Sequence, residues 1–491
     1  MDQNVFDVAI IGGGINGACL YHHLCRAGFS VVLLDKGDFA SGTSQGSAMM
    51  IWGGLLYLQN GDLSTVRRLC ASRERMLEQM GDWVKPRRFR YVTTRDGSRR
   101  PGVVHAALYL YWLLGGCRRA RPRKECEFPE RGFLTPGRHE QSFVFEEGSV
   151  EPSDARFVLH WLLPYLNGVQ TALNYCTLES GQYDRSSRQW RLDVRDTQLE
   201  QCGHVRARWM VNAAGVWTDA LNEKFGMDSP YMHVLSKGVF VGLKREARHR
   251  MPLIFDTRDG RDSMSFIPWG PVSLWGPTET VVERLEEGLA VEAEDVRSLL
   301  GELNRHLAKP ATPDDVVSLR WGVRPLVVRR PFNGNGGSLD LSRRYRIHRD
   351  ACLPWISLYG GKLTGCVSLA SEVVGMLSRT QSTNRGARHA NNRPAKAPPM
   401  VRHPELSEPV PEARWCADRE MCWTLEDYLR RRTNISQWIA RCGLGKRDEH
   451  AAHLTRLARS FCGEDEAMAR GAVEAYRRKI VDGFDRVLAD C

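Results

Sequence analysis

The chain lacks the cysteine spacing of a zinc site or a redox dithiol. Its 14 cysteines are scattered over 491 residues, and no two of them stand as C-x-x-C. Structural zinc sites and redox pairs need closely spaced thiols, so we expect no metal. Unpatterned cysteines in a long chain are typical of a reducing compartment, where most of them are small buried side chains.

Long apolar runs are also missing. The longest, residues 103–114, is too short to span a bilayer and includes His105, so it predicts a buried helix. No basic segment precedes the first apolar run at residues 8–11, which argues against a secretory leader. These absences predict a cytoplasmic protein. They leave open a peripheral contact with a membrane and a homo-oligomeric state.

Basic charge is in excess, with a formal net charge of +11. Such a charge suits an anionic substrate or a phospholipid surface as well as a nucleic acid, so it discriminates little. Aromatic residues are not interleaved with basic ones as in RNA-binding segments, and we therefore expect no nucleic-acid partner. Arginine clusters such as residues 430–432 are interpreted first as solvated faces.

A glycine motif follows the first apolar run. Residues 12–17 read GGGING and satisfy G-x-G-x-x-G between a predicted strand at 8–11 and a predicted helix at 15–27. These glycines permit a tight turn, the close approach of a pyrophosphate, and close packing of the helix on the strand. Asp35 ends the second predicted strand, where a carboxylate binds ribose hydroxyls. The combination predicts a bound dinucleotide.

Three further segments favour FAD over NAD. Residues 40–47 form a loop of small residues and hydroxyls that can wrap a pyrophosphate and a ribityl chain. Residues 211–217 are an apolar strand ending in small residues, and residues 359–365 open a helix whose N-terminus can stabilise negative charge on a reduced flavin. Residues 43–57 contain no histidine or cysteine to attach the ring, so we expect non-covalent FAD. The predicted cofactor-binding residues are Gly12, Gly14, Ile15, Asn16, Gly17, Asp35, Lys36, Thr43, Ser44, Ser47, Ala213, Ala214, Gly215, Trp217, Gly361, Lys362, Leu363 and Thr364.

The order of these segments predicts an α/β fold. We expect a discontinuous, Rossmann-like FAD-binding domain interrupted by an antiparallel-sheet substrate or cap domain, then a linker and a small all-α C-terminal domain. The predicted ranges are 1–62, 150–229 and 330–377 for the FAD-binding domain, 63–149 and 230–329 for the substrate domain, 378–412 for the linker and 413–491 for the helical domain.

These motifs, in this order, resemble the FAD-dependent glycerol-3-phosphate dehydrogenases of the D-amino-acid-oxidase-like superfamily. The matching segments are residues 7–58, 154–156 (DAR), 211–215 (VNAAG), 237–238 (KG), 266–269 (FIPW), 322–326 (GVRPL), 360–364 (GGKLT) and 425–433 (LEDYLRRRT). The resemblance covers nearly the whole chain. It implies removal of a hydride from a carbinol carbon to flavin N5, with the electrons passed on to oxygen or to a quinone.

The resemblance also implies the site. Arg324 and Arg343 match arginines that contact an anionic substrate, and Lys362 matches a lysine beside the flavin. The planar guanidinium fork suits phosphate or carboxylate. Lys362, Tyr57 and His233 are the candidates for the general base, although an ordinary, partly buried side chain is the simpler interpretation of His233.

Other positions depart from the family together. The family has His at Trp52, Arg at Leu56, Arg at Val234 and His at Phe240, and it has G-T-T-D where residues 276–279 read GPTE. The resemblance places Trp52 near the flavin, and Leu56 and Phe240 in the substrate pocket. Phosphate left unpaired among apolar groups is costly. We therefore expect a different or larger substrate with one polar or anionic end.

Three alternatives remain at this point. The same fold oxidises a C–H next to an amine in amine and amino-acid oxidases. Glycerol 3-phosphate itself can still bind through Arg324, Arg343 and Lys362. The third alternative is a non-catalytic basic protein that binds a membrane or a nucleic acid.

Overall fold

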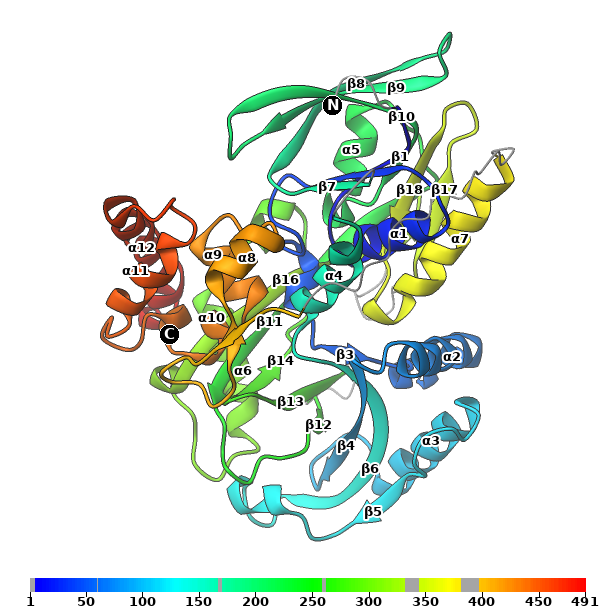
Figure 1. The fold of residues 1–491 in the computed structure, drawn as a ribbon. Coiled ribbons are helices and arrows are strands. Elements are labelled where there is room, and N and C mark those ends of the chain that lie inside the picture. Colours follow the sequence, from blue (N-terminus) through cyan, green and yellow to red (C-terminus); the bar gives the residue numbers. More distant parts are fainter. Residues whose placement is uncertain (1–4, 60, 167–169, 258–261, 332–343, 381–396) are drawn as a thin grey trace.

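Two β-sheets and a group of C-terminal helices make up the molecule (Figure 1). The computed structural model describes residues 5–59, 61–166, 170–257, 262–331, 344–380 and 397–491. The two sheets are joined through several chain crossings, since each draws strands from separate parts of the sequence.

The first sheet has eight strands and is parallel at its centre, in the order β18-β10-β1-β2-β7. Its strands are β1 Val5–Ile11, β2 Val31–Leu34, β7 Thr171–Leu173, β8 Cys176–Asp184, β9 Gln189–Asp196, β10 Gln201–Asn212, β17 Arg346–Arg349 and β18 Trp355–Tyr359. Helices α1 Ile15–Arg26, α4 Asp154–Leu162 and α7 Cys366–Thr380 share a core with one face. The opposite face is covered by β8, β9 and side chains of α5 Thr218–Lys224 and the residues after it.

The second sheet has ten strands and is mainly antiparallel, with one parallel pair, β4 and β12. Its strands are β3 Met50–Ile51, β4 Val84–Thr94, β5 Arg123–Glu125, β6 His139–Val150, β11 Tyr231–Lys244, β12 Leu253–Asp256, β13 Ser263–Trp269, β14 Val272–Gly276, β15 Thr280–Val282 and β16 Val316–Arg329. Helices α2 Leu63–Gln79, α3 Pro101–Leu114 and α6 Ala293–Asn304 accompany it. The two sheet types, with helices at the C-terminus, confirm the predicted fold class.

The C-terminal part is helical but broken into short pieces. Its helices are α8 Ala413–Arg419, α9 Leu425–Asp427, a π-helical turn Tyr428–Arg432, α10 Ile435–Trp438, α11 Ala451–Arg459, α12 Glu466–Ile480 and α13 Arg486–Ala489. Of the predicted linker, residues 381–396 lie outside the described residues, while β19 Met400–Val401 and β20 Val410–Pro411 pair within it.

The helix predicted to be buried is not. In α3, Val103 is 59% exposed, Leu110 42% and Leu113 57%. Only the opposite side, with Val104, Leu108 and Tyr111, is packed. The apolar run is therefore a surface helix, because the chain buries one of its faces and leaves the other to solvent. No helix among the described residues is both long and apolar enough to cross a bilayer.

Candidate functional site

Four parallel strands end at one edge of the first sheet. β1 lies between β10 and β2, so the chain leaves it on one side for β2 and meets β10 on the other. The residues that follow these strands are Gly12 after β1, Asp35 after β2, Ala213 after β10 and Gly360 after β18. Ligands of open α/β sheets bind beyond the carboxyl ends of the strands, where the strand order reverses. This edge is therefore the candidate site.

The glycine motif is closely packed at this edge. Gly12 has φ +112°, and a Cβ there would lie 2.5 Å from the carbonyl oxygen of Ala213. A Cβ on Gly17 would lie 1.9 Å from the carbonyl oxygen of Gly12, so only glycine lets α1 approach β1 this closely. Gly14 precedes α1, and a Cβ there would lie 3.1 Å from Ser44 Oγ. The glycines thus keep the turn and the start of α1 free of side chains.

The start of α1 offers polar groups to a ligand. Ile15 N donates to Ser44 Oγ at 3.0 Å, and the N-cap residue of the helix, Gly14, has no side chain to cap the other N–H groups of the first turn. Asn16 Nδ2 donates to the carbonyl oxygen of Gly360 at 3.0 Å, while its buried Oδ1 has no hydrogen-bond partner among the described residues. A helix N-terminus with an uncapped first turn is a site for a phosphate. These features fit the pyrophosphate of FAD.

Asp35 is held ready at the end of β2. Its Oδ2 accepts from Gly13 N at 2.6 Å and its Oδ1 from Gly37 N at 2.9 Å. Burial raises the pKa of Asp35 to about 6, although the two backbone N–H groups oppose the shift. Beside it, Lys36 Nζ lies 3.9 Å from the ring centroid of Trp217. Asp35 is thus oriented as a ribose-binding carboxylate would be.

The loop of small residues at 40–47 is held by hydrogen bonds to other segments of the chain. Thr43 Oγ1 donates to the carbonyl oxygen of Val323 at 2.5 Å. Ser47 donates to Asp154 Oδ2 from both its N, at 2.9 Å, and its Oγ, at 2.7 Å. Asp154 also pairs with Arg320, and both side chains are fully buried. The Ser47 hydroxyl is therefore engaged by the protein, and the Asp154–Arg320 pair is a support that the spacing of the motifs does not reveal.

The candidate catalytic residues come together from two segments. Lys362 Nζ lies 4.7 Å from the ring centroid of Tyr57, and Thr364 Oγ1 donates to the carbonyl oxygen of Trp52 at 3.3 Å. The Trp52 ring also meets the rings of Phe89 and Phe145 edge-on. The turn after β18 thus lies against the segment that follows β3.

Arg324 lies on β16, and both of its neighbours in sequence contact segments of the candidate cofactor site. Its neighbour Val323 accepts from Thr43, and its other neighbour, Pro325, has its carbonyl oxygen 3.4 Å from where a Cβ on Gly360 would be. The guanidinium lies across Gly238, where a Cβ would be 2.1 Å from Nη2. Arg324 is therefore placed at the cofactor edge, with 23% of its side chain exposed.

A carboxylate faces Arg324. Arg324 Nη1 lies 3.8 Å from Glu279 Oε2, 3.4 Å from the carbonyl oxygen of Thr278 and 3.5 Å from Ser236 Oγ. The departure of residues 276–279 from the family's run is visible in the sequence, but the position of Glu279 opposite Arg324 is not. That juxtaposition depends on the pairing of β11 with β16 and the turn after β14, which is a tertiary property.

The remaining predicted site residues differ in where they lie and in how deeply they are buried. Leu56 is half-buried in the segment that contains Tyr57, whereas Phe240 is only 2% exposed and packs in the core. Leu363 is also buried. Ala214 and Gly215 follow Ala213 directly after β10. Arg343 lies outside the described residues.

The His233 ring accepts a hydrogen bond from the backbone. Its Nε2 accepts from Gly360 N at 3.0 Å, and its Nδ1 lies 2.9 Å from Asp219 Oδ2. A neutral imidazole has one lone pair, and this one is used by the turn after β18. His233 is placed to hold that turn rather than to take a proton from a substrate.

The comparisons with known proteins decide the family. The family model "DAO: FAD dependent oxidoreductase" matches residues 7–349. The chain belongs to this family. A glycerol-3-phosphate dehydrogenase from Pseudomonas tolaasii is 29% identical over 376 residues, which cover 76% of this chain and 72% of that protein. A D-erythritol 1-phosphate dehydrogenase from Brucella abortus is 29% identical over 374 residues, covering 74% of this chain and 72% of that protein.

A solved structure extends the likeness over the full length. The crystal structure of a glycerol-3-phosphate dehydrogenase from Bacillus halodurans, complexed with FAD, aligns with a TM-score of 0.70 at 19% identity. The alignment covers 98% of this chain and 96% of that one. The predicted family is confirmed, and the protein is an FAD-dependent oxidoreductase related to glycerol-3-phosphate dehydrogenases. Family membership favours an enzyme over the non-catalytic binding protein.

Proposed function

We propose that this FAD-dependent oxidoreductase oxidises a C–H bond next to a hydroxyl, in a small substrate other than glycerol 3-phosphate with one polar or anionic end. The observation that supports the proposal best is the pairing of Arg324 with Glu279 beside the cofactor edge. FAD, when bound, would supply the hydride acceptor for the carbinol carbon.

The protein's own residues bind and orient the substrate. Arg324 binds the anionic end, because its fork matches a carboxylate or phosphate. Glu279 reduces the positive potential there, so a dianionic phosphate is bound less well than a monoanion or a neutral polar group. Leu56 and Trp52 contribute apolar surface, where an unpaired phosphate oxygen is costly. We infer that Lys362, whose Nζ lies 4.7 Å from the centroid of the Tyr57 ring, receives or relays the hydroxyl proton.

Anaerobic reduction of the bound flavin tests this proposal. Glycerol 3-phosphate, erythritol phosphate, free polyols and hydroxy acids are added in turn, and bleaching of the flavin spectrum is followed. A polyol phosphate with four carbons belongs in the set, because one relative is named for such a substrate. We expect slow or no bleaching with saturating glycerol 3-phosphate, and a gain with the double variant Trp52→His/Leu56→Arg. Rapid bleaching at micromolar glycerol 3-phosphate would restore that compound as the substrate.

Oxidation next to an amine is a second candidate, supported by the same pair. Arg324 and Glu279 together present a cation and a carboxylate, which are the partners of a zwitterionic amino acid. A hydroxy acid and the amino acid with the same side chain should be compared in flavin reduction. Faster reduction by the amino acid would favour this candidate. Oxygen uptake against reduction of a quinone analogue then identifies the electron acceptor.

We also infer a peripheral contact with an anionic lipid surface through α3. The exposed residues Val103, Ala106, Leu110 and Leu113 recur at helical spacing on one side of α3, and the helix carries no Asp, Glu, Lys or Arg. Figure 1 shows α3 at the outer edge of the molecule, beside α2 and β5. An apolar helix face of this length lies in the membrane interface rather than across it.

Basic residues flank both ends of this helix. The exposed ones are Arg95 and Arg100 before it, and Arg118, Arg121, Arg123 and Lys124 after it. Each cation near an anionic membrane surface contributes about 1 kcal/mol to binding. Tyr109 and Trp112 are half-buried on the helix, and both are residue types that favour the interface. Charge complementarity therefore favours an anionic bilayer as the partner of this face.

Co-sedimentation with vesicles tests the contact. We expect binding to vesicles containing phosphatidylglycerol, weaker binding to neutral ones, and loss of binding in Leu110→Glu/Leu113→Glu. Met468→Glu is the matched control, because Met468 is 62% exposed on α12, far from α3 in sequence. Binding that the double variant leaves unchanged would contradict the inference. A dimer that this variant abolishes, without any vesicle binding, would assign the face to a second copy of the chain.

A further inference from the structure

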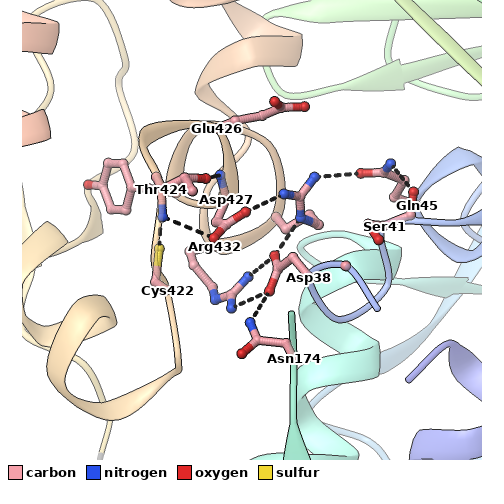
Figure 2. A network of polar contacts seen from close by, with 12 residues as sticks. Asp38, Ser41, Gln45, Asn174, Cys422, Thr424, Glu426, Asp427 and Arg432 are labelled. Atoms are coloured by element: carbon pink, nitrogen blue, oxygen red, sulfur yellow. Dashed lines mark hydrogen bonds and ion pairs between the residues drawn. The ribbon is translucent and has the colours of Figure 1, made fainter. Parts of the chain in front are cut away.

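Three consecutive arginines of the C-terminal region point at the loop that follows β2. Arg430, Arg431 and Arg432 belong to the π-helical turn Tyr428–Arg432. Arg431 and Arg432 are 4% and 1% exposed, so the interpretation of this cluster as a solvated face is wrong. Figure 2 shows Arg432 directed at Asp38. A π-helical turn inserts one residue per turn and is frequent at functional sites.

Asp38 is the centre of this contact. It is 1% exposed and accepts from Arg431 Nε at 2.5 Å, from Arg432 Nη1 at 2.6 Å, and from Asn174 Nδ2 at 2.8 Å (Figure 2). Burial alone would raise the pKa of Asp38, but Arg432 and Arg431 lower it to about 2. A buried carboxylate with two guanidinium partners is a rigid attachment point.

The same turn holds the far end of the loop. Arg430 Nη2 donates to the carbonyl oxygen of Gln45 at 2.5 Å, and Arg431 Nη1 donates to Gln45 Oε1 at 3.3 Å. Gln45 Nε2 in turn donates to the carbonyl oxygen of Ser41 at 2.6 Å. One turn of the C-terminal region therefore forms hydrogen bonds with both ends of the loop 38–45.

The loop 38–45 also contains residues that are expected to contact the cofactor. Ser44 lies within it and accepts from Ile15 N at the start of α1, where the pyrophosphate is expected. Thr43 also lies within it and donates to Val323, next to Arg324. Asp35, the ribose-binding candidate, precedes the loop by three residues. A shift of residues 38–45 would therefore change the geometry of several cofactor contacts at once.

We propose that the π-helical turn Tyr428–Arg432 is a clamp that sets the shape of the FAD-binding loop 38–45, so that FAD binding and docking of the C-terminal helices are coupled. The arginines are positioning residues, because they act through Asp38 and Gln45. Coupling of this kind is reciprocal: the clamp raises FAD affinity, and bound FAD stabilises the docked helices. The proposal rests on FAD dependence alone and needs no substrate.

Arg430 allows a test that separates positioning from folding. Its Nη1 is buried without a hydrogen-bond partner, and it forms no ion pair with any described residue. Burial and the neighbouring Arg320 lower the pKa of Arg430 to about 9, so its charge is costly. Arg430→Met removes this charge and the contact to Gln45 while keeping most of the packing. The FAD-free protein should therefore be no less stable than the parent.

The measurement is FAD affinity of the full chain, by flavin fluorescence, together with the thermal midpoint of the FAD-free protein. We expect Arg430→Met and Gln45→Ala each to weaken FAD binding by about tenfold, as for the loss of one charge-assisted contact, with the FAD-free midpoint unchanged. Arg477→Met is the control, because Arg477 is exposed on α12 and pairs with Asp448 instead. It should change neither quantity.

Hydrogen exchange supplies the reciprocal measurement. In the parent protein, FAD should slow exchange in residues 413–438, and Arg430→Met should reduce that protection. Unchanged FAD affinity in both variants would overturn the proposal. A loss of FAD affinity matched by an equal loss of FAD-free stability would also overturn it, since the arginines would then be purely structural. Neither result depends on which substrate the enzyme oxidises.

Discussion

At the scale of single residues, Arg324 is the side chain on which the substrate proposal depends most. Arg324→Ala should raise KM strongly while leaving FAD content and the thermal midpoint nearly unchanged, because 23% of its side chain is exposed and its Glu279 contact is long, at 3.8 Å. Loss of a charge-assisted contact to a ligand costs about 2–5 kcal/mol when the partner charge stays buried. Steady-state kinetics with the substrate found by flavin bleaching gives the answer. Unchanged KM would assign Arg324 a structural role.

Asp35 predicts a pH dependence of cofactor binding. Its pKa in the FAD-free protein is raised to about 6, against about 3.9 in an unfolded chain. The ionised form destabilises the FAD-free fold, so this group's contribution to stability is lost as the pH rises through 6. FAD affinity should change in the opposite direction, because ribose hydroxyls donate to the carboxylate. We expect FAD to bind about tenfold more weakly at pH 5 than at pH 7.5.

Fluorescence titrations with FAD at both pH values measure this effect. Asp35→Asn is the matched variant, since an amide keeps the size of the side chain without titrating. Its FAD affinity should be low and nearly independent of pH. Equal slopes in the parent and in Asp35→Asn would show that another group is responsible.

Residue chemistry was predictable where neighbours in sequence are also neighbours in space. The G-x-G-x-x-G turn and Asp35 belong to one βαβ unit, so their roles follow from spacing. Ser47 and His233 differ, because their hydrogen bonds go to Asp154 and Gly360, more than 100 positions away. Such partners are set by the packing of one sheet on the other, which a single sequence does not display.

At the scale of elements, α2, α3 and β6 hold the segment that carries Trp52. Glu147 on β6 accepts from Arg73 of α2 at 2.8 Å and from Gly53 N at 3.2 Å, and it also bonds Tyr111 of α3. Glu147 and Arg73 are almost fully buried. Glu147→Gln should therefore lower the free energy of unfolding by about 1.5–3 kcal/mol, since Arg73 loses this charged partner but keeps the buried Glu74.

Urea denaturation measures this loss. Glu78→Gln is the matched control, because Glu78 pairs with Arg118 on the surface, where both side chains are 58% exposed. It should cost less than about 1 kcal/mol. Similar losses in the two variants would contradict a special role for the buried pair.

Two elements show that a helical pattern in the sequence does not determine how the helix is buried or whether it is continuous. The apolar run at 103–114 is read correctly as a helix, but hydrophobicity alone does not say that the protein leaves one side of it uncovered. The run 425–439 looks like one helix, yet it is divided by the turn Tyr428–Arg432, in which Arg431 and Arg432 pair with the distant Asp38. In both cases the outcome depends on what lies opposite the element.

At the scale of the whole molecule, FAD should be held without a covalent bond. No histidine or cysteine stands among residues 43–57, and the contacts at the candidate site are hydrogen bonds and close packing. Acid precipitation should therefore release all of the yellow chromophore into the supernatant. Flavin that stays with the pellet after repeated washing would demonstrate a covalent link.

The pairing of the first sheet also has a consequence for biosynthesis. Val5 of β1 pairs with Arg206 of β10, and Met210 of β10 pairs with Trp355 of β18. At a synthesis rate of about 5–20 residues per second, β18 leaves the ribosome about 7–30 seconds after β10. During that time only the end of β10 has an open edge, because β9 pairs with residues 201–207 and β18 pairs with residues 210–212. An unpaired strand edge is a template for pairing with other chains. A chain that stops at residue 340 should accordingly aggregate and retain no FAD, whereas supply of the missing strand is the event that closes the sheet and completes the cofactor site.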